Sequence, residues 1–134
     1  MNEKKYTLSL PPTERKVPMK LHTEKGEITI SNDVFSNITG GAATNCYGVK
    51  GMAIRSATDG LVHLLRRESM AKGVKVTYHD DNSVSIELHI IVDNGVNLTA
   101  ISRAIMERVQ YDVSRATGAE VRNVDVFIDS MVIG

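Results

Sequence analysis

The residues that could bind a metal ion are four histidines and one cysteine. The chain has no Cys-x-x-Cys motif, and no two histidines lie three or four residues apart, the spacings common in zinc sites. His79 and His89 share the polar side of a predicted hairpin, but about six positions separate them there, roughly 20 Å at about 3.3 Å per residue. We therefore expect no metal ion and no other cofactor.

Carboxylate pairs and the single thiol offer no catalytic arrangement either. Asp125 and Asp129 face the same way on a predicted strand but lie about 13 Å apart, beyond the separation used in two-carboxylate hydrolysis. Cys46 comes near the end of a predicted helix, where the dipole raises the pKa of a thiol, and no histidine is placed to activate it. The chain also has no Walker loop. We predict that the protein is not an enzyme, unless a site forms between subunits.

One loop has a sequence motif that is found in nucleic-acid-binding domains. Gly48-Val49-Lys50-Gly51 matches the Gly-x-x-Gly with which KH domains clamp a nucleic-acid backbone. The KH loop joins two helices, whereas this loop is predicted to join a helix to a strand. The competing interpretation is a pair of turn glycines around a solvated lysine. A KH-like RNA-binding module that uses this loop with Arg55 and Arg66-Arg67 is therefore the alternative function, and nucleic acid is not the expected partner.

Charge is unevenly distributed along the chain. Sixteen basic and sixteen acidic residues give a formal net charge of zero, which argues against a basic nucleic-acid coat protein. Residues 48–75 hold six basic and two acidic groups, and residues 76–134 hold four basic and nine acidic groups. These segments could supply complementary surfaces for a protein partner or for a homo-oligomer. The candidate interaction residues are the six cations of the basic segment: Lys50, Arg55, Arg66, Arg67, Lys72 and Lys75.

The elements that would position these residues begin after a proline-containing stretch. Residues 1–18 hold all three prolines and little periodicity, so we predict a flexible N-terminal arm followed by a single domain over residues 19–134. Residues 20–30 are typical of a strand, interrupted at 24–26, with Ile28 and Ile30 facing inward. A helix is expected from residues 31–33 to Cys46, and its Gly40-Gly41 pair indicates that another element packs closely there.

The next segments are a short strand or ordered loop over residues 48–56 and a second helix over residues 59–72. Gly73 would end that helix in a left-handed conformation. Its leucines predict one edge of the core, and a basic amphipathic surface for anionic lipid is the alternative.

The second half of the chain is better specified. Alternating apolar residues predict a hairpin over 74–79 and 84–92 with a turn at 80–82. A long helix runs from Asn97 to Gly118, and a last strand covers 124–129. The order β-α-β-α-β-β-α-β predicts an α+β two-layer sandwich, a mainly antiparallel sheet with helices packed on one face.

Composition suggests where the protein works. A single cysteine fits a reducing compartment, and no apolar run approaches the length of a transmembrane segment. We expect a cytoplasmic location.

Several segments together resemble a known family. They are Gly26-Glu-Ile-Thr-Ile-Ser31, Gly41-Ala-Ala-Thr-Asn-Cys-Tyr-Gly-Val-Lys-Gly-Met52, Lys72-Gly-Val-Lys-Val76, Val92-Asp-Asn-Gly-Val-Asn97 and Thr117-Gly-Ala-Glu-Val121 followed by Val124-Asp-Val-Phe-Ile128. In this order they resemble the alkaline shock protein family, also called the Gls-type general stress proteins, and within it a small cytoplasmic subgroup. The match covers about residues 20–130.

The resemblance implies a non-enzymatic bacterial protein of the cell-envelope stress response. Some members self-assemble and associate with the membrane indirectly, through a separate anchor protein. The genomic context of the subgroup suggests a link to lipid metabolism. The family supplies no defined binding residues that could be carried over to this chain.

Overall fold

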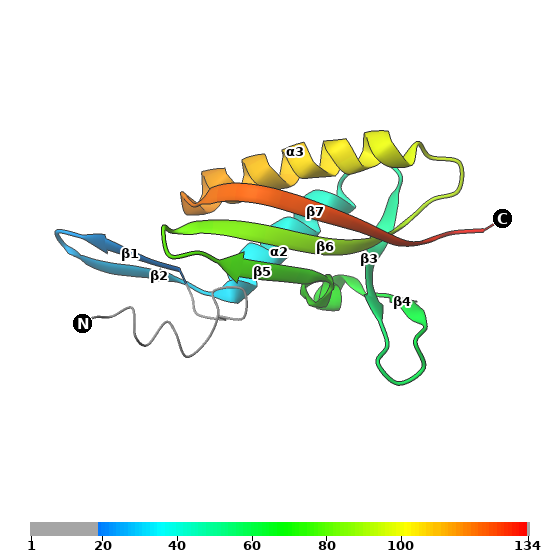
Figure 1. Cartoon of the computed structure of the whole chain (residues 1–134), viewed down its shortest axis with the longest axis horizontal. Coiled ribbons are helices and arrows are strands. Elements are labelled where there is room, and N and C mark those ends of the chain that lie inside the picture. Colours follow the sequence, from blue (N-terminus) through cyan, green and yellow to red (C-terminus); the bar gives the residue numbers. More distant parts are fainter. Residues whose placement is uncertain (1–18, 134) are drawn as a thin grey trace.

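The computed structural model describes residues 19–133, and its main feature is a five-stranded sheet covered on one face by two α-helices (Figure 1). The predicted α+β fold with helices on one face is confirmed. The predicted arm over residues 1–18 lies outside the described residues.

Strand β6 (Ser83–Val92) is the centre of the sheet. β5 (Val74–Tyr78) and β3 (Val49–Arg55) both pair antiparallel with it, along successive lengths of one edge. β7 (Glu120–Met131) pairs with the other edge and is parallel to it. β4 (Val62–Leu64) extends the sheet beyond β3. The predicted hairpin over 74–92 is therefore confirmed, and its partner on the far edge is a parallel strand.

The long helix α3 (Leu98–Thr117) begins and ends where the sequence predicts. The side chain of Asn97 accepts a hydrogen bond from the backbone N–H of Ala100 at 2.9 Å, and Gly118 adopts the left-handed conformation with φ 79°. Its buried stripe packs on the sheet beside helix α2 (Asn32–Thr44). The core between helices and sheet is made of apolar side chains such as Phe35, Leu88 and Ile105, all of them fully buried.

The predicted helix over residues 59–72 is wrong. Residues 62–64 form β4, and residues 67–73 form the short 3-10 helix η2 (Arg67–Gly73). The backbone N–H of Leu65 donates to the carbonyl of Met52 at 2.8 Å, so pairing with β3 takes the hydrogen bonds that a helix would need. The leucines also divide between environments, because Leu65 packs against the core while Leu61 and Leu64 are exposed.

The glycines of this region act through close packing. A Cβ at Gly40 would lie 3.0 Å from Cγ of Met70 in η2, which confirms that another element packs closely on α2. Gly73 does not adopt the predicted left-handed conformation. Instead, a Cβ there would lie 2.9 Å from the carbonyl oxygen of Ala53, so the residue allows β3 to pass close by.

Residues 19–30 form a hairpin of their own. β1 (Met19–Thr23) and β2 (Gly26–Ile30) pair antiparallel with each other and with no strand of the main sheet. The predicted interruption at 24–26 falls at their turn. Ile28 was expected to face inward, but this is wrong: it is 49% exposed, because the hairpin extends away from the core at one end of the molecule (Figure 1).

Candidate functional site: the open face of the sheet

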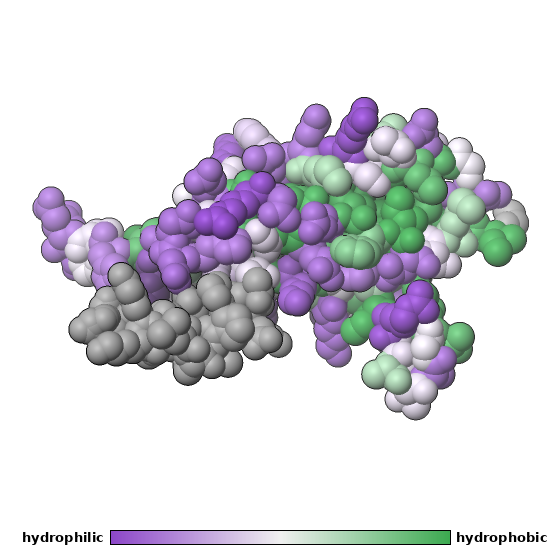
Figure 2. Space-filling model, in the orientation of Figure 1, coloured by the Kyte–Doolittle hydropathy of each residue, from purple (hydrophilic) through white to green (hydrophobic). Residues whose placement is uncertain are grey.

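The two sides of β6 meet different surroundings. Ile86, Leu88 and Ile90 face the helices and are at most 1% exposed. The alternate residues face the opposite side, which no described helix covers, and Figure 2 views the molecule from this side. We call this side the open face. Its side chains come from three neighbouring strands: Lys75, Thr77, Ser85, Glu87, His89, Asn123, Asp125, Phe127 and Asp129.

A histidine between two carboxylates lies near the middle of the open face. Nδ1 of His89 is 2.9 Å from Oδ2 of Asp129, and Nε2 is 3.0 Å from Oε2 of Glu87. Both ring nitrogens therefore face acceptors, and only the doubly protonated imidazole can donate to both. The ring stacks on Phe127, with centroids 4.7 Å apart and planes 18° from parallel. The histidine is thus held in one orientation by two strands.

An irregularity in β7 places one of these carboxylates. Phe127 pairs with His89 and Ile128 with Ile90, but the register then shifts, so that Ser130 pairs with Ile91. Asp129 is the extra residue of this β-bulge. A bulge redirects the side chain of the inserted residue. The carboxylate of Asp129 lies on the same side as Phe127 and reaches His89 across the ladder at 2.9 Å.

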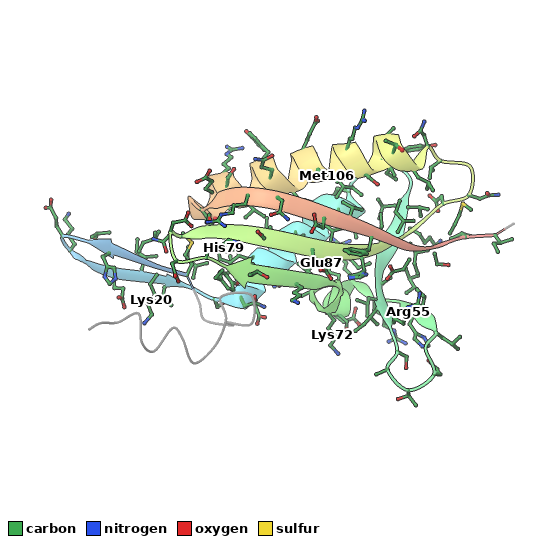
Figure 3. The ribbon with its side chains drawn as sticks, viewed as in Figure 1. Lys20, Arg55, Lys72, His79, Glu87 and Met106 are labelled. Carbon is green, nitrogen blue, oxygen red and sulfur yellow. The ribbon has the colours of Figure 1, made fainter. Side chains whose placement is uncertain are left out.

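A pocket of about 490 Å³ lies on the open face next to this cluster. Three cations line it from three different elements: Arg55 from β3, Lys72 from η2 and Lys75 from β5. Glu87 and Asp129 line the same pocket (Figure 3 labels Arg55, Lys72 and Glu87). The other lining residues are Ala53, Ile54, Gly73, Val74, His89 and Phe127. The pocket therefore has cations on the side of β3, η2 and β5 and carboxylates on the side of β6 and β7, and apolar groups accompany the charges on both sides.

The six predicted interaction residues are all exposed, and the structure divides them. Arg55, Lys72 and Lys75 line the pocket, whereas Lys50, Arg66 and Arg67 do not. The two adjacent arginines instead follow the β3–β4 hairpin, where β4 leads into η2. The six residues were grouped because they are close in sequence, whereas the fold places only Arg55, Lys72 and Lys75 around one pocket.

The groups whose pKa values are shifted lie away from the pocket. Burial raises the pKa of Cys46, and burial with the nearby Asp33 raises that of Tyr78 to about 12. Hydrogen bonds from Ser83 and Arg122 hold the pKa of Asp81 far below its usual range, in the turn between β5 and β6. A backbone N–H does the same for Asp59 to a lesser degree. Strongly shifted groups often mark catalytic sites, but the shifts here follow from packing and turn structure.

The remaining residues considered from sequence do not assemble into a reactive site. His79 pairs with Ser83 as predicted, and its ring contacts Ser85 Oγ at 2.8 Å, far along the sheet from His89. Gly48-Val49-Lys50-Gly51 joins α2 to β3, with its last three residues inside the strand. Within residues 19–133, no group of three His, Cys, Asp or Glu side chains has a geometry that could bind a metal ion.

Sequence reasoning missed the cluster around His89. The two-residue period of β6 does place Glu87 and His89 on one side. The pairing of β7 with β6 and the bulge at Asp129 are not indicated by any pattern in the neighbouring sequence. Alternation along the last strand puts Asp125 and Asp129 on one side, but nothing local shows that Asp129 lies beside His89.

The fold and its open face define a small α+β protein whose most distinctive site is a charged sheet surface. A family model, the alkaline shock protein 23 family with a cell envelope-related function, matches residues 20–133. The chain belongs to this family, and the resemblance described from sequence is confirmed.

Two bacterial proteins are similar to this chain over most of its length. The protein YloU of Bacillus subtilis is 33% identical over 114 residues, covering 84% of this chain and 94% of the relative. The protein Spy1614 of Streptococcus pyogenes is 34% identical over 116 residues, covering 86% and 95%. Both are called uncharacterized proteins.

Among solved structures, two of MamM CTD match with a TM-score of 0.44 and 18% and 19% identity. They cover 73% of this chain and 93% and 95% of those chains. No helix among residues 19–133 is both long and apolar enough to span a membrane.

Proposed function

We propose that this member of a cell envelope-related family is a non-catalytic cytoplasmic protein that associates with a second copy of itself through the open face of its sheet. The family and its envelope-related function are established by the match over residues 20–133. The mode of action is the proposal, and it rests on the surface chemistry of the open face.

The observation that carries the proposal is the separation of charge across this face. Arg55, Lys72 and Lys75 line one side of the pocket, and Glu87 and Asp129 line the other. Asp125 pairs with Glu87 and extends the acidic side along β7. A two-fold axis through such a face brings the basic side of one copy onto the acidic side of the other. The face is therefore complementary to itself.

An exposed apolar residue on each charged side adds a reason to associate. Phe127 is 45% exposed and Ile54 is 39% exposed, although both line the pocket. Exposed aromatic side chains at the centre of a surface are typical of protein interfaces. Burying these two residues in a dimer would remove them from water, and the charges around them would set the orientation.

The chemistry of the pocket supports a non-catalytic role. No serine, threonine or cysteine lines it, so the pocket lacks the usual hydroxyl or thiol nucleophile. Both ring nitrogens of the one histidine lie within hydrogen-bond distance of carboxylates of this chain, so both are already occupied by partners within the site. No feature favours the KH-like RNA-binding alternative, because the Gly48–Gly51 segment does not join two helices.

The wider role follows from the resemblance. We expect a part in envelope stress, with indirect membrane association through a protein partner and a link to lipid metabolism. The self-association proposed here would give such a partner a repeated surface to bind.

Sedimentation velocity over a range of protein concentrations tests the proposal. We expect a dimer that weakens as NaCl rises from about 0.1 M to about 1 M, where the Debye length falls from about 10 Å to about 3 Å. The Lys72→Glu/Lys75→Glu variant should raise the dimer dissociation constant at least tenfold, because like charges would then face each other (at least about 1.4 kcal/mol). The matched control, Arg103→Glu/Arg115→Glu on α3, should leave it unchanged. A monomer at every salt and protein concentration would contradict the proposal.

A further inference from the structure

The β3–β4 hairpin is a second exposed feature. It shares Ile54 and Arg55 with the pocket of the open face, whereas its turn over residues 56–61 lies outside that pocket. It projects from the body of the molecule at the end of the sheet (Figure 1). Its strands pair through Ala53↔Leu64, Ile54↔His63 and Arg55↔Val62. Leu61, in the turn, is 59% exposed, and Leu64 is 49% exposed. Figure 2 shows apolar and strongly polar residues side by side on this projection. Large apolar side chains on a projecting tip indicate a binding surface.

The turn of the hairpin satisfies much of its own backbone. Oγ of Ser56 accepts hydrogen bonds from the N–H groups of Thr58 and Asp59, and Oδ1 of Asp59 accepts one from the N–H of Leu61 at 2.9 Å. The N–H groups of Ser56 and Gly60 are also bonded within the turn. When backbone groups are hydrogen-bonded to one another, transferring them out of water costs less free energy. This turn is therefore suited to a surface that offers few hydrogen-bond partners.

Cations flank the exposed leucines. Arg55 lies at the end of β3, where its guanidinium donates to the carbonyl of Gly60 at 2.6 Å and so reaches along the turn. Arg66 and Arg67 follow β4 and are exposed. The one carboxylate of the turn, Asp59, is engaged by the Leu61 N–H and lies 3.7 Å from Nε2 of His63. Arg55, Arg66 and Arg67 thus place positive charge at the base of the hairpin, behind a turn whose one large apolar side chain is Leu61.

We propose that the tip of the β3–β4 hairpin inserts into the surface of a bilayer that contains anionic lipid. Leucine at the tip would enter the boundary between headgroups and acyl chains, and the arginines would lie among the anionic headgroups. Convex shape favours lipid over a protein partner, because a narrow tip offers little of the area that a stable protein interface buries. This contact is direct, unlike the partner-mediated membrane association that the family resemblance implies.

Cosedimentation of the full chain with lipid vesicles tests the inference. We expect binding to vesicles of equal parts phosphatidylglycerol and phosphatidylcholine, and at least tenfold weaker binding to phosphatidylcholine alone. Leu61→Ser should lower the partition coefficient about tenfold, because the variant lacks the leucine side chain that would be buried in the bilayer. Arg66→Gln/Arg67→Gln should lower it about thirtyfold, because two charges near the headgroups are lost.

Matched variants on α3 serve as controls. Leu98, which is 43% exposed, is replaced in Leu98→Ser, and two exposed arginines are replaced in Arg103→Gln/Arg115→Gln. Both variants should partition as the unmodified chain does. The inference is wrong if the chain binds both kinds of vesicle equally or neither, or if Leu61→Ser behaves as Leu98→Ser does. It is also wrong if Leu61→Ser abolishes dimerisation while vesicle binding persists, since the tip would then be a protein contact.

Discussion

The covered and open faces of the sheet share the same strands but differ in what their side chains do. Along β6, Ile86, Leu88 and Ile90 are removed from water by the two helices. The residues between them, Glu87 and His89, take part in a charged cluster beside a pocket. The helices account for the first set. Nothing within residues 19–133 covers the second, and the open face therefore shows where to look for function.

The comparison also separates two kinds of interaction energy. Apolar burial on the covered face contributes to the free energy of unfolding of the single chain. Exposed charged groups on the open face, such as Lys72 and Lys75, contribute little to folding, because exposed ion pairs typically stabilise by less than about 1 kcal/mol. Substitutions on the two faces should therefore affect different measurements.

Leu88→Ala should have the largest effect on folding. Leu88 is fully buried against the helices, and such truncations cost about 2–5 kcal/mol through lost burial and the cavity left behind. Its neighbour on the open face serves as the matched control, because Glu87→Gln should change the free energy of unfolding by less than about 1 kcal/mol. Urea unfolding measures both. Similar losses for the two variants would remove the distinction between the faces.

Tyr78→Phe should have a smaller effect that depends on pH. The hydroxyl of Tyr78 donates to Oδ1 of Asn32 at 2.7 Å, and its loss should cost about 1 kcal/mol near neutral pH. Because burial raises the pKa of Tyr78 from 10.0 to about 12, the folded chain keeps a proton there that the unfolded chain loses. Unfolding free energy should therefore fall as pH rises from 10 to 12.

The variant should lack this part of the fall, and thermal unfolding across that pH range measures it. Tyr47→Phe is the control, since Tyr47 is 94% exposed. An equal pH dependence in the two variants would mean that the buried phenol does not contribute.

Phe127→Ser should have the smallest effect on folding and a clear effect on association. Phe127 is already 45% exposed, so its removal should cost the single chain less than about 1 kcal/mol. In the dimer it would be a central apolar contact, and its loss should raise the dissociation constant at least tenfold. Chemical unfolding and sedimentation velocity measure the two effects. Tyr111→Ser, on the outer side of α3, should leave association unchanged, and dimerisation that survives Phe127→Ser would place the interface elsewhere.

Local rules were enough to predict much of the fold. Asn97 and Gly118 bound α3 because capping depends on residues close in sequence. The register of the hairpin could be predicted from its turn, so His79 and His89 lie apart as expected. The helix predicted over 59–72 was wrong because the spacing of its leucines fits a helix as well as it fits the observed strand and 3-10 helix. Pairing with the distant β3 decided its structure, and no local pattern reports that pairing.

The candidate site was predicted only in part, for the same reason. Arg55, Lys72 and Lys75 were selected for their charge and do line one pocket. Their acidic counterpart depends on β7 lying parallel to β6 and on the bulge at Asp129. Both features are fixed by long-range packing. The sequence could therefore suggest a basic surface, whereas its self-complementarity required the structure.

Mixing two oppositely charged variants tests the central claim most directly. Lys72→Glu/Lys75→Glu leaves Arg55 as the one cation lining the pocket, and Glu87→Lys/Asp125→Lys leaves Asp129 as the one carboxylate lining it, so the first face becomes mainly acidic and the second mainly basic. Each variant alone should sediment as a monomer, because its copies repel. An equimolar mixture should form a dimer, since the two faces are then complementary. A mixture that sediments as two monomers, or either variant dimerising alone, would contradict self-association through the open face.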